Sequence, residues 1–411
     1  MSHAVLSLAQ GHCHPRFERV REVFAHSLAR GDEVGAAVCV WHQGERVIDL
    51  WGGKTGREPS ASAWEADTLT TIFSCTKGVT AMAMLKLIER GLLDLDAPLG
   101  DYWPALVQPA QGRGAVAAWE AERERLTPRM LLNHRSGLLG LRAPLTLDEL
   151  EDRLALSARL EAEPLAWAPN SAQGYHGVTY GLYAAELFRR VAGEPLGAFI
   201  ARELTTPAGA DLFLGLPPKE EARCAPIIPN GPREVLTGIV PSLMRGSREG
   251  RFFRGALLPG GVGKLAFGQP ASLGARGLRN FNTPRVRRME LAWANGMASA
   301  RGLANLYRAL LAGELVDVSL LEPLKERQSW VERDRVLRKP LGFSQGFIKE
   351  ETHLFSPNPE SFGHPGAGGA LGWADPKEGL AIGYVMNRMG YHVRSPRALA
   401  LCHAVYQCLE A

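Results

Sequence analysis

Ser74 and Lys77 are three residues apart, where a short apolar run gives way to a helix-like pattern. No other serine in the sequence is followed by a lysine at this spacing. Because residues three apart share one face of a helix, the Lys77 amine would lie one turn above the Ser74 hydroxyl. A serine hydroxyl becomes a useful nucleophile only when a base is within hydrogen-bond reach. The pair therefore predicts an activated serine.

A structural role for Ser74 competes with this interpretation, because serine is a favoured helix N-cap. A capping motif, however, favours Glu or Gln at the third helical position, where a carboxylate complements the helix dipole. Lys77 has the opposite charge, which costs about 0.3–1 kcal/mol. The same dipole lowers a lysine pKa, as does burial, and a general base must be neutral. This motif alone supports both interpretations equally.

Two other groups contain residue types that could react or bind metal. Cys75 adjoins Ser74, but no His, Asn or Asp partner is suggested locally, and buried cysteines are commonly inert. The run from Gly11 to His14 holds two histidines and a cysteine without a distant partner group. We therefore expect neither a metal ion nor another cofactor.

The length, hydrophobic content, charge and cysteines of the chain indicate what class of protein it is. The 411 residues are 45% hydrophobic, which is enough for two or three structural units. The net charge of +4 comes from 47 basic and 43 acidic residues that are mixed along the chain, so we expect no nucleic-acid or membrane partner. The six scattered cysteines predict free thiols in a reducing compartment. With no secretory signal pattern and no apolar stretch of about 18 residues, a cytoplasmic location is expected.

The elements that must position these residues can be outlined from the sequence pattern. Apolar periodicity predicts a surface helix over residues 16–30, and residues 34–41 and 46–50 form a predicted β-hairpin. Residues 78–90, directly after Lys77, are apolar on nearly every face, which predicts a buried helix. Further helices are predicted at 127–133, 147–160, 179–192, 196–204, 299–312 and 396–409.

Residues 214–292 are rich in Gly, Pro and Arg and show no sustained period, which predicts a long irregular lid or substrate wall. Strands return at 343–349, 363–368, 369–375 and 380–386. Strands at both ends of the chain predict one discontinuous α/β sheet domain, residues 1–72 and 330–411. It would enclose a mainly helical domain, residues 73–329.

Two later motifs accompany the serine and lysine. Tyr175-His176-Gly177 lies in a loop that runs into a helix, and His364-Pro365-Gly366 lies near a strand. With Ser74-Cys75-Thr76-Lys77, their order and spacing resemble the serine hydrolases of the penicillin-recognising fold. These include class C β-lactamases, DD-peptidases and, above all, family VIII carboxylesterases. Supporting stretches are residues 89–96, 131–138 and 175–181, and the resemblance covers about residues 20 to 409.

The resemblance implies a β-lactamase/DD-peptidase-like fold, an antiparallel sheet flanked by helices with an inserted helical domain and the active site between them. Ser74 would form an acyl-enzyme, while Lys77 and Tyr175 would move protons to the leaving alcohol and from water. For Lys77 to be neutral near pH 7, its pKa must fall by about three from the reference value of about 10.4, which costs about 4 kcal/mol. Tyr175 would need a comparable downward shift, so the pair is expected to share one proton.

The resemblance also implies an oxyanion hole made of two backbone amides, the N–H groups of Ser74 and Ala367. We expect Ala367 to lie on the strand that follows His364. In an extended strand, residues 365 and 367 direct their amides to the same side. Pro365 has no N–H, which leaves Ala367 as the donor.

The substrate-binding positions implied are His364, Gly366 and Gly177. In the lactamases, Lys and Thr occupy the places of His364 and Pro365 and help to hold the carboxylate of the drug. The His364 ring is largely neutral at pH 7 and Pro365 has no hydroxyl, so one charge-assisted and one neutral hydrogen bond to the carboxylate are lost. This loss weakens binding of the drug by about 2–4 kcal/mol, or about 30- to 1000-fold. Gly177, in place of the asparagine of the Tyr-x-Asn motif, removes another polar contact.

These departures favour a serine carboxylesterase that acts on small, uncharged, short-chain esters, with weak hydrolysis of β-lactams as a side activity. A β-lactamase or DD-peptidase-like amide hydrolase and an acyltransferase stay open as alternatives. The presence of Ser74, Lys77 and Tyr175 together argues against an inactive, binding-only member of the fold. An α/β-hydrolase requires a Gly-x-Ser-x-Gly motif, which the sequence lacks. The oligomeric state is not predicted.

Overall fold

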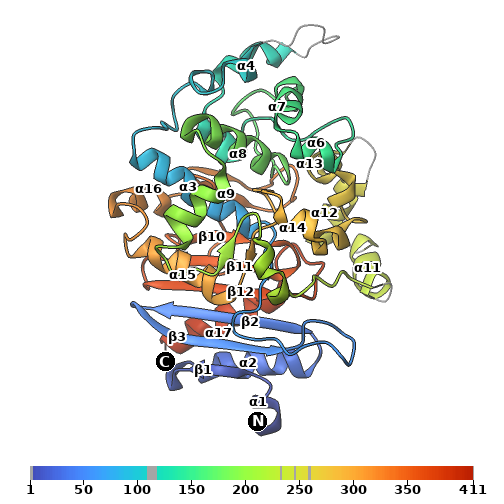
Figure 1. Cartoon of the computed structure of the whole chain (residues 1–411), viewed down its shortest axis with the longest axis vertical. Helices are drawn as coiled ribbons and strands as arrows, with labels where there is room; N and C mark the ends of the chain where they lie inside the picture. Colours follow the sequence, from blue (N-terminus) through green and yellow to red (C-terminus); the bar gives the residue numbers. More distant parts are fainter. Residues whose placement is uncertain (1–2, 109–117, 232–233, 245–246, 258–260, 411) are drawn as a thin grey trace.

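The computed structural model describes residues 3–108, 118–231, 234–244, 247–257 and 261–410 (Figure 1). Its main sheet is antiparallel, with nine strands in the order β1-β3-β2-β12-β11-β10-β9-β8-β7. The strands are β1 (Gln10–Cys13), β2 (Gly35–His42), β3 (Glu45–Gly53), β7 (Ser329–Val331), β8 (Leu341–Ser344), β9 (Phe347–Lys349), β10 (Phe362–Pro365), β11 (Leu371–Asp375) and β12 (Leu380–Met386). The predicted discontinuous antiparallel sheet is confirmed, because β2 pairs with β12.

Helices cover both faces of this sheet, as its buried central strands require. Gly52 faces Leu28 of α2 (Glu18–Ala29), and Gly383 faces Ala304 of α15 (Ala300–Leu311). Cross-strand register puts these two glycines on opposite faces. Helix α17 (Pro396–Glu410) packs with α2, and both termini lie at this end of the molecule (Figure 1).

The buried helix after Lys77 is confirmed as α3 (Cys75–Glu89), nearly all of whose side chains are inaccessible to solvent. It contacts β9, β10 and β11 of the sheet on one side, and α8 (Thr179–Ala192) and α9 (Leu196–Ile200) on the other. Helix α3 therefore joins the sheet to the helical part of the chain. The domain boundaries at residues 72/73 and 329/330 stay a prediction.

The helical part also contains shorter helices, and a second sheet of three short strands. The helices are α4 (Pro104–Val107), α5 (Pro128–Leu132), α6 (Leu147–Glu151), α7 (Arg153–Ala162), α16 (Glu322–Lys325) and the π-helix η4 (Ala201–Thr205); the strands are β4 (Thr70–Thr71), β6 (Met297–Ala298) and β5 (Leu212–Phe213). The short helix α1 (His3–Leu6) lies instead beside α2, at the sheet end of the molecule (Figure 1). The single helix predicted over 147–160 is wrong. Asp152 interrupts it, and its side chain accepts the N–H groups of Leu154 and Ala155 to begin α7.

Residues 214–292 differ from the irregular segment predicted. They contain α11 (Val240–Met244), α12 (Arg248–Leu257), α13 (Val262–Phe267) and α14 (Pro284–Arg288), as well as several single turns of helix. Each of these helices is ten residues or shorter. A periodic pattern needs about 11–18 residues to be recognised, which explains why the sequence did not reveal them.

Two strand predictions also need correction. The strand predicted over 343–349 is a hairpin of β8 and β9, because Gln345 and Gly346 adopt φ of 48° and 93° at a tight turn. The strand predicted over 363–368 ends at Pro365. Gly368 and Gly369 have φ of 85° and 142°, which an extended strand does not allow. Ala367 therefore lies in a turn and not on a strand.

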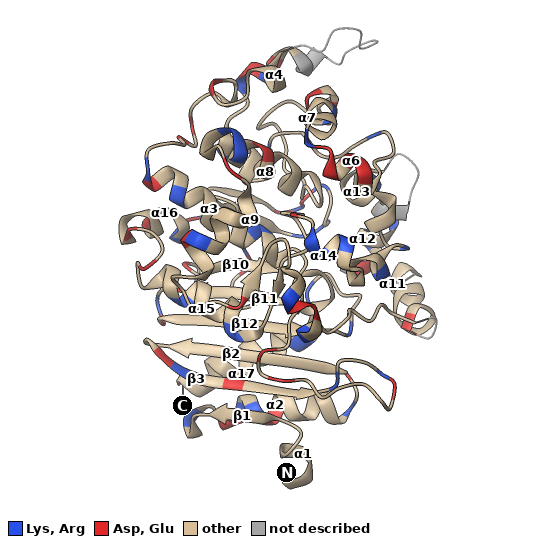
Figure 2. Ribbon diagram, viewed as in Figure 1, with Lys and Arg blue, Asp and Glu red and all other residues tan. Residues whose placement is uncertain are grey.

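Charged side chains of both signs are interspersed over the elements of the fold (Figure 2). Within the part of the chain that the structure describes, no helix combines the length and the apolar character needed to cross a membrane.

The burial of α3 predicts a steep dependence of stability on its packing. Leu85 of α3 is 0% exposed, whereas Leu92, just past the end of the helix, is 47% exposed. Leu85→Ala should lower the free energy of unfolding by about 2–5 kcal/mol, because it leaves a cavity. The matched control Leu92→Ala should change it by about 0.5 kcal/mol or less. Urea denaturation measures both, and equal losses would contradict the packing described.

Candidate active site

Ser74 lies at the N-terminal end of α3, three residues after β4 ends. The chain turns sharply before it, since Phe73 has a φ of 44°, which is a strained value for a bulky residue. The Ser74 side chain makes no capping hydrogen bond. The capping interpretation of this side chain is therefore wrong, and the half-buried hydroxyl is free for other partners.

Lys77 is fully buried one turn along α3. Its Nζ lies 3.1 Å from Ser74 Oγ and donates hydrogen bonds to the carbonyl oxygens of Gly177 (2.8 Å) and Trp293 (3.0 Å). None of these partners carries a negative charge, so burial lowers the pKa of Lys77 well below its ordinary value. The downward shift expected from the sequence is found.

Tyr175 faces the same amine, with its ring centroid 5.0 Å from Lys77 Nζ, and its hydroxyl lies close enough to Ser74 for Ser74 to lower its pKa. Burial raises the pKa of Tyr175, and the opposing effects of Ser74 and of the Arg394 charge are smaller. The downward shift expected for Tyr175 is therefore wrong. A lowered pKa of Lys77 and a raised pKa of Tyr175 both favour the phenol as the site of the pair's proton.

The loop that carries Tyr175 is fixed by two buried side chains. Asp334 Oδ1 accepts the Tyr175 N–H at 3.1 Å and also accepts the N–H groups of Val336 and Leu337. His134 Nδ1 accepts the N–H of His176 at 2.9 Å, and its ring lies 4.8 Å from that of Tyr175. Sequence reasoning missed Asp334, because nothing in its spacing set it apart from other loop carboxylates.

Gly366 brings the turn after β10 against the Ser74 segment. A Cβ atom at this position would lie 2.3 Å from the Ile72 carbonyl oxygen and 3.2 Å from Cys75 Sγ, so only glycine permits this approach. Ala367, the next residue, is exposed and begins a 3-10 turn. The N–H groups of Ser74 and Ala367 both lie at the start of helical turns and have no intrahelical partner.

His364 is 1% exposed, and its Nδ1 lies 2.8 Å from the Pro365 carbonyl oxygen, to which it donates. Its ring centroid lies 6.0 Å from that of Tyr175. Burial is the main reason that the pKa of His364 lies well below its ordinary value. The imidazole is therefore neutral and supplies no cation at the position where the lactamases have lysine.

The space beside Gly177 that a side chain would take is filled by the aromatic ring of Phe267. A Cβ atom here would lie 2.3 Å from a ring carbon of Phe267, which ends α13. The Val178 N–H donates to the Ala266 carbonyl at 3.2 Å and ties α13 to the Tyr175 loop. An aromatic ring thus occupies the volume that the asparagine of a Tyr-x-Asn motif would take. Phe267 was missed because no residue pattern linked it to Gly177.

A cationic cluster lies close to the site but is already paired. The charge of Arg394 lowers the pKa of both Tyr175 and His364, which shows that it lies near them. Arg394 forms an ion pair with Glu350, and Lys339 binds the other oxygen of the same carboxylate. This pairing leaves little free positive charge for an anionic ligand.

Cys75 is fully buried, and burial raises the pKa of its thiol to about 12. A protonated thiol without access to solvent is a poor nucleophile. Among the described residues, no group of three or more His, Cys, Asp or Glu side chains is arranged to hold a metal ion.

Comparisons with known proteins agree with this geometry. A family model described as Beta-lactamase matches residues 20–405. Esterase/beta-lactamase LipL of Mycobacterium tuberculosis is 33% identical over 391 residues, 92% of this chain and 83% of that protein. The crystal structure of a family VIII carboxylesterase has a TM-score of 0.82 at 32% identity, covering 97% of this chain and 99% of that one. EstA from Arthrobacter nitroguajacolicus Rue61a has a TM-score of 0.79 at 30% identity, covering 98% of each chain. The chain belongs to the beta-lactamase family.

Proposed function

We propose that this chain is a carboxylic ester hydrolase that works through an acyl-enzyme on Ser74. The observation that carries the proposal is the contact between Ser74 Oγ and the buried, uncharged amine of Lys77, 3.1 Å apart. The similarity to LipL and to a family VIII carboxylesterase, both above 30% identity, supports the same reaction class.

In acylation, Lys77 acts as the general base. A neutral amine has two N–H bonds, which the Gly177 and Trp293 carbonyls accept, and its lone pair is then directed at the Ser74 hydroxyl. As Oγ bonds to the ester carbonyl carbon, its proton passes to Nζ. The N–H groups of Ser74 and Ala367 stabilise the oxyanion.

Tyr175 carries the proton onward. Because its pKa is raised, the phenol keeps its own proton and works as a relay, donating to the leaving alcohol oxygen while it accepts from Lys77. The C–O bond to the alcohol breaks and the acyl group stays on Ser74. In deacylation the relay runs in reverse: water loses its proton to the pair, attacks the acyl carbon, and the proton returns to Ser74 Oγ.

The proposed substrate is a small, uncharged ester. His364 is neutral, and the Arg394 charge is paired with Glu350, so neither of these two side chains offers a free cation to an anionic acyl group. The Phe267 ring at Gly177 replaces a polar side chain with an apolar surface. Phe73, the neighbour of Ser74, packs against Phe281 with ring centroids 5.2 Å apart, which keeps this segment apolar.

We also propose a cytoplasmic location, which the six free cysteines support.

The nucleophile can be tested by covalent labelling. A fluorophosphonate should add one label to the wild-type chain, on the peptide that contains Ser74, and none to Ser74→Ala. Ser74→Ala, Lys77→Ala and Tyr175→Phe should each lower kcat on p-nitrophenyl butyrate by about 10²-fold or more. Peptide mass spectrometry locates the label. A label on Cys75 or on another serine would overturn the assignment.

The dependence of activity on pH tests the state of Lys77. Only the neutral amine is active, so kcat/KM should rise with pH through the Lys77 pKa. Because burial lowers this pKa well below the ordinary lysine value of 10.5, the rise should be complete far below that pH. Lys77→Arg should be inactive throughout, since a guanidinium is not deprotonated in proteins. A wild-type rise centred near pH 10.5 would refute the proposed base.

Substrate class can be tested with a matched pair of esters. p-Nitrophenyl butyrate and mono-p-nitrophenyl succinate have acyl chains of equal length that differ by a terminal carboxylate. We expect kcat/KM for the neutral ester to be about 30-fold or more higher, since neither the neutral His364 nor the paired Arg394 offers the carboxylate a free positive charge. Nitrocefin, an anionic β-lactam, should also be turned over slowly. Equal kcat/KM for nitrocefin and the neutral ester would contradict the esterase preference.

A further inference from the structure

The turn at residues 366–370, called here the oxyanion turn, has little internal support. Gly366 N–H donates to the Ala370 carbonyl at 2.7 Å, and Gly369 N–H donates to the Gly366 carbonyl at 3.2 Å. Between them, Gly368 has a φ of 85°. An oxyanion donor stabilises the transition state only if its direction is fixed beforehand. Contacts from outside the turn must therefore fix the Ala367 N–H.

Arg397 in the first turn of α17 supplies such a contact. Its Nη2 donates to the Gly368 carbonyl at 2.6 Å and to the Arg388 carbonyl at 2.9 Å. Gly390 N–H donates to the same Gly368 oxygen at 2.8 Å. The Gly368 carbonyl, one residue beyond Ala367, is thus held by two donors from outside the turn.

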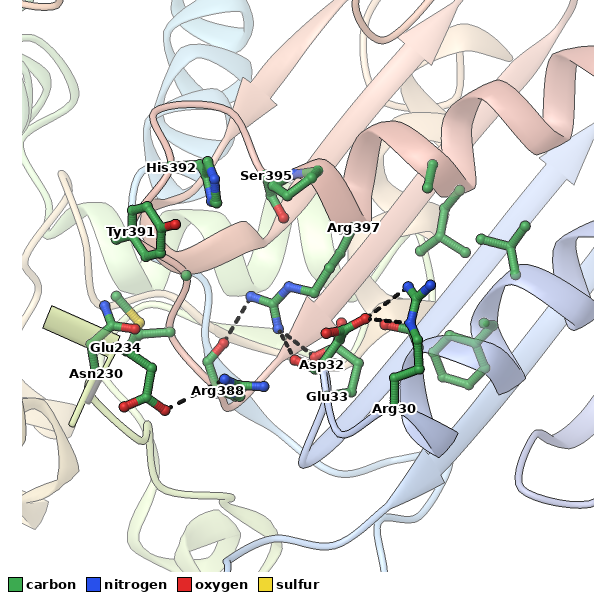
Figure 3. Close-up of a pocket in the computed structure, with 18 residues that line it drawn as sticks. Arg30, Asp32, Glu33, Asn230, Glu234, Arg388, Tyr391, His392, Ser395 and Arg397 are labelled. Carbon is green, nitrogen blue, oxygen red and sulfur yellow. Dashed lines mark hydrogen bonds and ion pairs between the residues drawn. The ribbon is translucent and has the colours of Figure 1, made fainter. Parts of the chain in front are cut away.

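The other nitrogen of the Arg397 guanidinium, Nη1, is held by residues that precede β2. Arg397 Nη1 donates to Glu33 Oε2 at 2.6 Å and to the Asp32 carbonyl at 3.0 Å. The side chains of Arg397 and Glu33 are 12% and 1% exposed, and Tyr384 donates its hydroxyl proton to Glu33. Figure 3 shows Arg397 between Glu33 and Asp32 on one side and Arg388 on the other. A planar guanidinium with partners on two sides has little rotational freedom.

We propose that Arg397, anchored by Glu33, is a positioning residue that holds the oxyanion turn so that the Ala367 N–H is directed at the developing oxyanion. The inference rests on the proposed function, in which Ala367 is an oxyanion donor. Arg397 touches neither Ser74 nor Lys77 by any contact described above. Its effect on the reaction would pass only through the Gly368 carbonyl.

The setting of Arg397 allows a test by chemical rescue. Arg397 lines a cavity of about 290 Å³ whose wall also includes Arg30, Glu33, Arg388 and Ser395 (Figure 3). If the side chain is removed by Arg397→Ala, a small guanidinium ion can enter from this cavity and occupy the same set of acceptors. A residue that only stabilised the fold would show no such rescue of catalysis.

The experiment measures kcat and KM of Arg397→Ala on p-nitrophenyl butyrate, with and without millimolar guanidinium. We expect kcat to fall about 10- to 100-fold, less than the about 10²–10³-fold for removing an oxyanion donor itself, with KM nearly unchanged. Guanidinium should restore part of kcat with saturation, whereas tetramethylammonium, which has no N–H donors, should not. In Arg397→Lys, which keeps a cationic donor, kcat should fall less than in Arg397→Ala.

The matched control is Arg30→Ala, which removes an arginine from the same cavity. Arg30 is 70% exposed and pairs with Asp32 on the surface, so its loss should leave kcat unchanged. If Arg397→Ala fails to fold, Arg397→Lys carries the test: wild-type kcat in that variant would overturn the proposal.

Two further outcomes would also overturn it: an unchanged kcat in folded Arg397→Ala, or a loss of kcat that guanidinium does not restore. Failure of the proposed function itself would look different, because Ser74→Ala would then keep its activity. If Ser74→Ala is inactive and Arg397→Ala is fully active, only the inference about Arg397 fails.

Discussion

The burial of the Lys77 amine is the constraint on which the rest of the site depends. An amine removed from water needs hydrogen-bond acceptors, and here they are carbonyls 100 and 216 residues further along the chain. Helix α3, the Tyr175 loop and the segment before β6 must therefore meet at one nitrogen atom. No carboxylate completes this set, so burial lowers the pKa of the amine and favours its neutral form beside Ser74. These hydrogen bonds stabilise the buried amine on α3, and they also hold it beside Ser74 for the proposed reaction.

Missing side chains shape the site as much as the side chains that are present. Gly366 lets the oxyanion turn touch the Ser74 segment, and Gly177 lets the Phe267 ring lie against the Tyr175 loop. In the proposed reaction the first approach places the oxyanion turn beside Ser74, and the second makes the surroundings of Tyr175 apolar. With the neutral ring of His364, these features join the activated serine to surroundings that suit an uncharged substrate.

Residue spacing and the family resemblance selected Ser74, Lys77 and Tyr175, which the structure brings together, and long periodic segments such as α8 were predicted with their bounds. Features that depend on contacts between distant segments were not predicted. The Trp293 carbonyl is a backbone group, so no residue type in the sequence marks it as a partner of Lys77. Ala367 does not lie on the predicted strand because the two glycines after it adopt positive φ. The upward pKa shift of Tyr175 depends on burial by rings from separate elements, which no local pattern reports.

The central claim, that Lys77 is neutral beside Ser74, is tested most directly by NMR titration of protein labelled with ¹³C at the lysine Cε atoms. Lys339 and Lys349 are also buried, so the Lys77 resonance is assigned as the one absent from Lys77→Arg. This account predicts that the assigned resonance titrates well below the range of the exposed lysines. A Lys77 resonance that titrates together with the exposed lysines, near pH 10.5, would contradict it.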